Sequence, residues 1–350
     1  VNFDWAEGQP DAMVAKDNCS ARWTGKQAFG DGYYRFVTDT DQGVRLWVDN
    51  TLVIDKWAQQ NSKQQKVLKL AAGLHTLKME YFDSWSVAKA KLNWEKLPTC
   101  NNLPENQFCG EFYATPDFSG DLADLVLADQ INFDWAGGSP SSLVPSDRFS
   151  VRWTGNMRFD KGLYRFLTDV DDGVKVWIDD KLLIDAWVTK SQQRRLFAMT
   201  AGLHKVKVEY REDAGSAKVN VGWEKAIDCS TDIPQGKFCA SFYNTKDLSG
   251  EVADNRYDDT INFDWGSAAP QIGVNADNFS TRWQGKFDFA EGEYTFTVRT
   301  DDGFRLWVDD KILIDAWELQ GATTYTKRIF LTGGTHTVKA GYYEATRQAA

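Results

Sequence analysis

The stretch Asn132-Phe133-Asp134-Trp135 occurs three times in this chain, first as Asn2-Phe3-Asp4-Trp5 and last as Asn262-Phe263-Asp264-Trp265. Successive copies start 130 residues apart, and Val176-Trp177-Ile178-Asp179 recurs in similar form at the same spacing. Self-similarity at a fixed period is the signature of a repeat architecture. A chain of 350 residues also exceeds the size that one hydrophobic core commonly supports. The sequence therefore predicts three tandem copies of one domain.

The phase of the repeat predicts where each domain begins and ends. We expect domains at residues 1–97, 107–225 and 237–350, joined by linkers at residues 98–106 and 226–236. Each linker contains proline and polar residues, as segments between domains usually do.

The two terminal copies differ from the middle one. The first copy has no counterpart of the opening segment Phe108–Tyr113, and the third has no counterpart of the closing segment Asn220–Lys225. We expect either that the polypeptide continues in both directions or that neighbouring molecules supply the missing strands. Both routes predict head-to-tail self-association, because the contact joins unlike surfaces.

Apolar residues within a repeat follow a period of two. Val174, Val176 and Ile178 alternate with Lys175 and Trp177, which is the pattern of a half-buried strand. Asp179-Asp180 then separates this run from the next apolar run, and both residue types tolerate the positive φ of a tight hairpin. Short strands with turns every 8 to 12 residues, roughly, predict an antiparallel β-sandwich in each copy.

Composition narrows the classes of protein. Hydrophobic residues make up 42% of the chain, as in folded domains, and the net charge is -10. A polyanion is repelled by such a charge, so we expect no nucleic-acid partner. No apolar run approaches the ~20 residues that span a bilayer, so we expect no membrane insertion in this segment.

The ordered motifs of each copy resemble the PA14 domain. In the middle copy they are Val151-Arg152-Trp153-Thr154-Gly155, Asp171-Asp172-Gly173, Val176-Trp177-Ile178-Asp179 and Ala201-Gly202-Leu203-His204. The resemblance covers nearly the whole chain and implies a β-sandwich of the kind found in bacterial toxins, glycosidase insertions and microbial adhesins. It is less specific for activity, since PA14 domains serve as sugar-binding modules, adhesin heads or structural spacers.

The resemblance also implies a metal site. In the calcium-dependent lectins of that family, two consecutive Asp residues joined by a cis peptide hold Ca²⁺, and the ion coordinates sugar hydroxyls. By position the pair corresponds to Asp171-Asp172 and Asp301-Asp302, whereas Asp41-Gln42 replaces one carboxylate by an amide and predicts weak or absent metal binding. Hard cations prefer such oxygen ligands. The alternative is that Asp-Asp-Gly forms only a turn.

A second loop completes such a site and supplies further candidate ligand-binding residues. It corresponds to residues 82–86, 211–215 and 343–347, which include Ser86 and Arg347 at their ends. Besides Asp172 and Asp302, the candidates for ligand binding are Glu212, Asp213, Glu344 and Trp85. Trp85 has no counterpart in the other copies, and it stacks on a sugar or packs against a neighbouring domain.

Cysteines recur at each junction between copies. Cys100 with Cys109 and Cys229 with Cys239 predict two disulfides, which are typical of an oxidising, extracellular setting on a secreted or cell-surface protein. The odd Cys19 is interpreted as a buried free thiol, with an intermolecular bridge as the alternative.

The histidines do not indicate catalysis. His75, His204 and His336 occupy one repeat position on an apolar strand face, where a structural histidine bonding a nearby loop is expected. The sequence contains no G-x-S-x-G elbow and no H-E-x-x-H or C-x-x-C ligand set. We therefore expect a protein that is not an enzyme.

Three functions fit these features. The first is a segment of a longer cell-surface or filament-forming array with calcium-dependent carbohydrate-binding and adhesion capacity, whose partner is a glycan or polysaccharide. The second is a purely structural extracellular fibre or coat. The third is the accessory carbohydrate-binding region of a secreted glycosidase.

Overall fold

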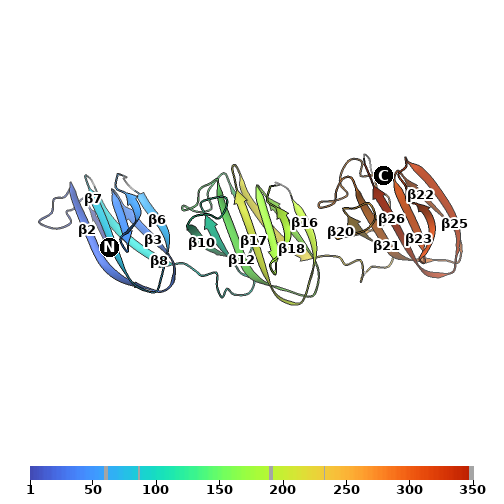
Figure 1. Cartoon of the computed structure of the whole chain (residues 1–350), viewed down its shortest axis with the longest axis horizontal. Helices are drawn as coiled ribbons and strands as arrows, with labels where there is room; N and C mark the ends of the chain where they lie inside the picture. The colour runs from blue at the N-terminus through green and yellow to red at the C-terminus, as the bar shows by residue number, and fades with distance from the viewer. Residues whose placement is uncertain (59–61, 86, 189–191, 232, 347–350) are drawn as a thin grey trace. The chain divides into compact units, whose positions relative to one another are not determined.

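The computed structural model describes residues 1–58, 62–85, 87–188, 192–231 and 233–346. These residues form strands β1 to β26, and none of them forms a helix (Figure 1). The strand pairings of repeats one and three are antiparallel, as are four of those in the described part of repeat two. The expected all-β fold is confirmed.

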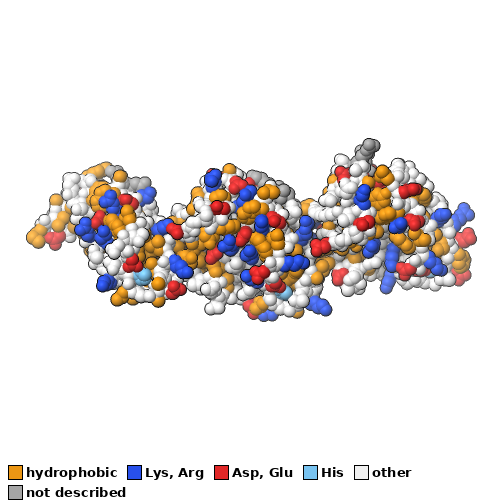
Figure 2. All heavy atoms as spheres, viewed as in Figure 1, with side chains coloured by type: hydrophobic (Ala, Val, Ile, Leu, Met, Phe, Trp, Pro, Cys, Tyr) orange, Lys and Arg blue, Asp and Glu red, His pale blue; other side chains and the backbone are white. Residues whose placement is uncertain are grey.

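The chain forms two compact units. The first comprises Val1–Met157, Asp171–Val174 and Lys205–Lys218, and the second comprises Arg158–Val170, Lys175–His204 and Val219–Ala350. No helix of the described residues is long and apolar enough to cross a membrane. Figure 2 shows Lys and Arg interspersed with Asp and Glu on the face drawn, without a broad surface of one charge.

Repeat one lies wholly in the first unit and packs two four-stranded sheets face to face. Their orders are β1-β8-β3-β6 and β2-β7-β4-β5. The strands are β1 (Asn2–Ala6), β2 (Cys19–Phe29), β3 (Gly32–Thr40), β4 (Val44–Val48), β5 (Thr51–Lys56), β6 (Ser62–Leu70), β7 (Gly73–Asp83) and β8 (Ala88–Lys96). Phe36, Leu46 and Tyr81 are at most 1% exposed in the core between the sheets, because alternate residues of each strand face inward.

Repeat two contributes strands to both units. In the first unit β9 pairs with β10 and β12, and in the second unit β13 pairs with β16 and β18. The strands are β9 (Phe108–Tyr113), β10 (Leu122–Ala128), β11 (Ile131–Ala136), β12 (Phe149–Phe159), β13 (Gly162–Val170), β14 (Gly173–Ile178), β15 (Lys181–Ala186), β16 (Gln193–Met199), β17 (Gly202–Glu212) and β18 (Ala217–Lys225). Val174, Val176 and Ile178 are buried, as their alternation predicts.

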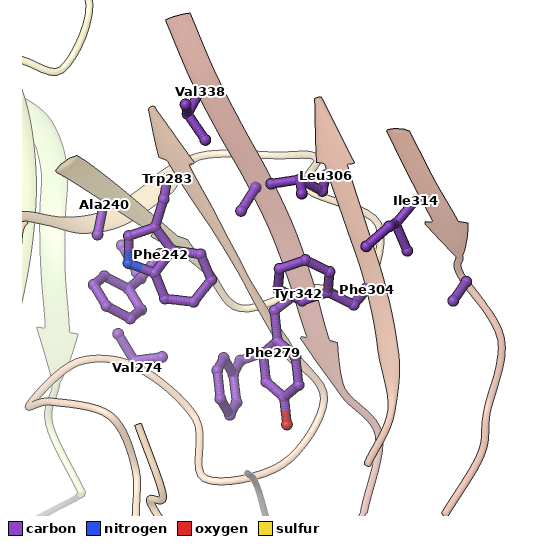
Figure 3. Close-up of a cluster of buried hydrophobic side chains, with 13 residues drawn as sticks. Ala240, Phe242, Val274, Phe279, Trp283, Phe304, Leu306, Ile314, Val338 and Tyr342 are labelled. Atoms are coloured by element: carbon purple, nitrogen blue, oxygen red, sulfur yellow. The ribbon is translucent and has the colours of Figure 1, made fainter. Parts of the chain in front are cut away.

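Repeat three lies wholly in the second unit. Its sheets have the orders β20-β19-β21-β26-β23-β24 and β22-β25. The strands are β19 (Phe238–Tyr243), β20 (Val252–Asp258), β21 (Phe279–Phe289), β22 (Gly292–Thr300), β23 (Gly303–Val308), β24 (Lys311–Ala316), β25 (Thr323–Leu331) and β26 (Gly334–Glu344). Figure 3 shows Phe279, Trp283 and Tyr342 gathered in the core beside Phe242 and Phe304.

The repeats differ at their sheet edges. Strand β2 ends its sheet, and Trp23 on it is only partly buried, whereas Trp153 and Trp283 at the same repeat position are at most 1% exposed. Among the described residues, β22 pairs with β25 alone, whereas β3 and β13 each pair with two neighbours. The domain boundaries and the head-to-tail association stay predictions.

In each repeat, a histidine side chain contacts an aspartate of the hairpin turn. Asp179 and Asp180 have φ values of 48° and 63°, as a tight hairpin requires, so the predicted turn is confirmed. The Asp179 carboxylate lies 2.6 Å from Nδ1 of His204, and Asp309 lies 2.6 Å from Nδ1 of His336. The structural role expected for the histidines is confirmed, because each one ties a hairpin turn to the neighbouring strand.

Both predicted disulfides are present. Cys100 is bonded to Cys109 and Cys229 to Cys239, so each bridge joins a linker to the first strand of the following repeat. Cys19 is the free cysteine of the described residues and is partly buried. Closing such short loops stabilises each junction by roughly 2–3 kcal/mol.

Each junction also contains a buried ion pair that the sequence did not predict. Arg35 on β3 contacts Glu95 of its own repeat and lies 2.5 Å from Asp124 on β10. Arg165 on β13 repeats the arrangement, 2.6 Å from both Glu224 and Asp254 on β20. The side chain of Asp254 is only 2% exposed, and its compensating charge comes mainly from Arg165, with Arg194 as a second cation at 3.7 Å.

We predict that Arg165→Ala lowers the free energy of unfolding by about 3 kcal/mol, because the substitution removes the nearer counterion of the buried Asp254 carboxylate and leaves only Arg194, at 3.7 Å. Urea denaturation monitored by tryptophan fluorescence measures the loss. Lys237→Ala is the control, since its partner Asp259 is 80% exposed at 3.0 Å, and it costs less than about 1 kcal/mol. Equal losses from the two substitutions would contradict the role of Arg165.

Candidate functional site

The candidate loops meet the end of a central strand in each repeat. In repeat two, the Tyr210 hydroxyl donates a hydrogen bond to Oε2 of Glu212 at 2.7 Å. Oδ2 of Asp172 accepts hydrogen bonds from the backbone N–H of Asp213 at 2.6 Å and of Ala214 at 3.3 Å. Strand β17 therefore delivers Glu212 to the loop that contains the Asp171-Asp172 pair.

Glu212 is the unusual group of this cluster. It is fully buried, and its Oε1 atom has no hydrogen-bond partner. Burial, reinforced by the nearby carboxylates of Asp172 and Asp171, raises the pKa of Glu212 from its ordinary 4.5 to about 7. An unsatisfied buried oxygen costs about 1–3 kcal/mol, so the site is poised to accept a proton or a cation.

Repeat three has the same arrangement. The Tyr342 hydroxyl donates to Oε2 of Glu344 at 2.7 Å, and Oδ2 of Asp302 accepts from the backbone N–H of Ala345 at 2.8 Å. Oε1 of Glu344 is buried without a partner, and burial together with the charges of Asp302 and Asp301 raises its pKa to about 7. Burial also raises the pKa of Asp302.

Repeat one has only one carboxylate in its first loop, because Gln42 takes the place of the second aspartate. Nε2 of Gln42 donates to Oδ1 of Asp83 at 3.2 Å and to the backbone carbonyl of Trp85 at 2.9 Å. Oε1 of Gln42 accepts from the backbone N–H of Ser84 at 3.0 Å, and Asp41 accepts from the Tyr81 hydroxyl at 2.8 Å. The amide of Gln42 thus bridges the two loops in repeat one.

The structure brings most of the predicted residues together. Asp171, Asp172 and Glu212 belong to one cluster, and Asp301, Asp302 and Glu344 form its counterpart in repeat three. The Asp213 carboxylate instead pairs with Arg211 at 3.1 Å and is 47% exposed. Trp85 is 59% exposed, and its carbonyl contacts Gln42. Ser86 and Arg347, at the ends of the second loops, lie outside the described residues.

One acidic residue per site escaped the sequence reasoning. Asp147 accepts a hydrogen bond from the backbone N–H of Gly215 at 2.9 Å, which attaches a third loop to the cluster. Its counterparts lie near the buried carboxyls of the other repeats. Burial raises the pKa of Asp83, with Asp41 and Asp17 adding to the shift. Burial likewise raises the pKa of Glu344, with Asp302, Asp301 and, least, Asp277 adding to it. The signal was available, because Asp17, Asp147 and Asp277 recur at the 130-residue spacing.

The donor chemistry fits a hard cation, although its ligands are not fully converged. Carboxylates from three loops and an unpartnered Glu212 oxygen suit Ca²⁺. In the described part of the chain, no three His, Cys, Asp or Glu side chains are arranged to hold a metal ion. The described peptide bonds are all trans, including those of the two Asp-Asp pairs, unlike the cis bond that the resemblance implies.

We predict that the chain without calcium loses stability as the pH rises from about 4.5 to about 7. The raised pKa of Glu212 means that the folded state retains a proton that the unfolded state releases in this range. The double variant Glu212→Gln, Glu344→Gln removes about 1–3 kcal/mol of this decline per site. Urea denaturation in EDTA at a series of pH values tests the prediction, and identical pH profiles for the variant and the parent chain would contradict it.

Comparison with known proteins yields relatives of two kinds. The curated protein Anti-sigma-I factor RsgI3 of Acetivibrio thermocellus is 34% identical over 248 residues, which are 64% of this chain and 38% of that protein. A solved anti-sigma factor domain-containing protein is 33% identical, with 64% of this chain and 85% of that chain covered and a TM-score of 0.32. A solved PA14 sugar-binding domain from an RTX adhesin is 16% identical, with 35% and 91% covered and a TM-score of 0.30.

The family model described as the PA14 domain matches three consecutive segments. They are residues 1–100, 109–232 and 234–350, so almost the whole chain is covered. Each segment contains one set of the loops and the tyrosine-bearing strand described above. The chain therefore belongs to the PA14 domain family and consists of three tandem repeats of that domain.

Proposed function

We propose that this chain is a non-catalytic carbohydrate-binding array in which repeats two and three bind Ca²⁺ and repeat one does not. The observation that carries the proposal is the contrast at the second position of the first loop. All three repeats have a buried acidic side chain with an unpartnered oxygen, namely Asp83, Glu212 and Glu344. The neutral Gln42 donates a hydrogen bond to Asp83, whereas Asp172 and Asp302 add negative charge beside the glutamates.

A cation reduces the repulsion between the neighbouring carboxylates of repeats two and three. This repulsion is smaller in repeat one, because the side chain of Gln42 is neutral. In repeat two, the charges of Asp171 and Asp172 act on the buried Glu212, and in water-poor surroundings such repulsion is poorly screened. A divalent cation neutralises these charges at once. In repeat one, the neutral Gln42 donates hydrogen bonds to Oδ1 of Asp83 and to the backbone, so the buried Asp83 carboxylate, whose Oδ2 has no partner, has one negative charge fewer beside it in the first loop.

The residues have separate roles in this proposal. Asp171, Asp172 and Glu212 hold the ion in repeat two, after side-chain rotation brings their oxygens together, and Asp301, Asp302 and Glu344 do so in repeat three. Bound calcium supplies open coordination positions that accept vicinal sugar hydroxyls. The exposed carboxylate of Asp213 contacts the sugar at the rim of its site, and Trp85 offers an exposed aromatic face in repeat one.

The setting proposed for the array is extracellular. Two disulfides persist most readily in an oxidising compartment, and they support a secreted or cell-surface location. The identity of 34% to an anti-sigma factor favours a second candidate function, in which the repeats form the ligand-sensing region of a longer regulatory protein. This chain spans 38% of that relative, so the regulatory role is part of the proposal.

Calorimetric titration of the EDTA-stripped chain with Ca²⁺ tests the proposal. We expect two sites per chain, with dissociation constants of about 10⁻⁴ to 10⁻³ M as in other extracellular modules. Asp172→Asn removes one site because an amide supplies less negative charge than a carboxylate. Gln42→Asp adds a third site beside Asp41 and Asp83. Asp180→Asn in the hairpin turn is the control and leaves both sites intact.

Glycan-array binding in Ca²⁺ and in EDTA then tests the sugar ligand. Binding that depends on calcium and falls in the Asp172→Asn, Asp302→Asn variant supports the proposal. Equal calcium binding by all three repeats, or calcium binding without any calcium-dependent glycan signal, counts against it.

A further inference from the structure

A cavity of about 530 Å³ lies in the second unit, and its lining includes no residue of the candidate loops described above. Strands β13, β15 and β16 line it on one side, and β19, β20 and β21 line it on the other, with part of the linker that contains Cys229. A cavity of this size accommodates a small ligand such as one or two sugar rings. The ion pair of Arg165 with Asp254 holds β13 against β20 beside it.

Two of the residues that line the cavity in repeat three differ from their counterparts in repeat two. Residues that lie side by side on adjacent strands form a row across each sheet. In repeat two the row is Leu125, Glu111 and Arg152. In repeat three the row is Asn255, Ser241, Arg282 and Gly341. The large residues of repeat two have become small in repeat three, except for the arginine.

Asn255 is the buried polar group of the cavity. It lines the cavity, is 4% exposed and donates from Nδ2 to the backbone carbonyl of Ile227 at 2.9 Å. Its Oδ1 atom is buried and has no hydrogen-bond partner. The carbonyl partner of Nδ2 identifies the unpartnered atom as the amide oxygen. This oxygen is covered in the present side-chain position, and a shift of the Asn255 side chain brings it to a hydroxyl in the cavity.

The equivalent position in repeat two has no polar side-chain atom that requires a hydrogen-bond partner. Leu125 is 4% exposed and packs in a cluster of buried apolar side chains with Val67, Leu97 and Leu122. Replacing this leucine with Asn255 in the other junction sacrifices apolar packing and introduces an unsatisfied oxygen. A ligand that brings a hydroxyl group provides a reason for the exchange.

Arg282 is the second unusual group. Its counterparts are paired, Arg22 with Glu80 at 2.8 Å and Arg152 with Glu209 at 2.9 Å. Arg282 lies opposite Gly341 instead, and the described residues give it no ion pair. The guanidinium stays within the cavity lining, 5.7 Å from the ring centre of Tyr243, with its donors available to a ligand.

The remaining lining has the chemistry of a sugar site. Asp228 and Glu251 add two carboxylates, and Lys181 and Arg282 add two cations, so the charges of the lining balance. Phe197 and Tyr243 contribute aromatic surface. Balanced charge with paired donors and acceptors suits neutral hydroxyl groups better than an ion.

We propose that this cavity is a second carbohydrate site, which binds a neutral sugar unit independently of calcium. Asn255 accepts one hydroxyl through Oδ1, Arg282 donates to sugar oxygens, and Glu251 and Asp228 accept further hydroxyls. The site shares its ligand class with the proposed function but none of its residues. Failure of the calcium sites therefore leaves this proposal standing, and the reverse also holds.

The test uses the full chain in EDTA, titrated with glucose, galactose, mannose, xylose and cellobiose and observed by saturation-transfer NMR. We expect saturable binding of at least one of these sugars. Asn255→Leu, which introduces the residue of repeat two, weakens binding about tenfold through loss of a hydrogen bond and of space. Asp310→Asn, at an exposed position in the hairpin turn of repeat three, is the control and leaves binding in EDTA unchanged.

A second variant tests the same proposal if Asn255→Leu folds poorly. Ser241→Glu places the glutamate of repeat two beside Arg282, so it occupies the guanidinium and narrows the cavity. Thermal unfolding checks that each variant is folded. Absence of saturable binding of every sugar in EDTA overturns the proposal. Wild-type affinity in a folded Asn255→Leu or Ser241→Glu variant also overturns it.

Discussion

Each repeat buries a tyrosine in its core, and the hydroxyl of that tyrosine must find an acceptor inside the protein. Tyr81 donates to Asp41 at 2.8 Å, and Tyr210 and Tyr342 donate to Glu212 and Glu344 at 2.7 Å. Because the acceptor is a carboxylate, satisfying the core tyrosine places a negative charge next to the candidate loops. The hydrophobic core and the candidate loops are therefore linked by the hydroxyl of one tyrosine in each repeat.

The three repeats balance this buried charge differently while keeping one fold. Repeat one uses the amide of Gln42, whereas repeats two and three place Asp172 and Asp302 beside the buried glutamate. The junctions show the same principle, since the buried Asp254 carboxylate is compensated by Arg165 and Arg194. A few polar substitutions inside the same sandwich are thus enough to give the loops of neighbouring repeats different charges.

The sequence predicted the fold well because repetition and a period of two are local patterns. The Asp179-Asp180 hairpin and the role of His204 followed from residue type and position, and both are present. The pairing of Arg35 with Asp124 escaped prediction, because 89 residues separate the partners and no local pattern relates them. The roles of Asp147 and Asn255 also needed the structure, since each depends on which strands become neighbours.

The most direct test of the account is a crystal structure of the chain soaked in Tb³⁺, read through its anomalous difference map. Terbium resembles calcium in its preference for oxygen ligands and marks each occupied site by itself. The account predicts one peak between Asp172 and Glu212 and one between Asp302 and Glu344, with no peak beside Gln42. A peak of equal height beside Gln42, or no peak in repeats two and three, would contradict the claim that the residue paired with the buried carboxylate decides where the cation binds.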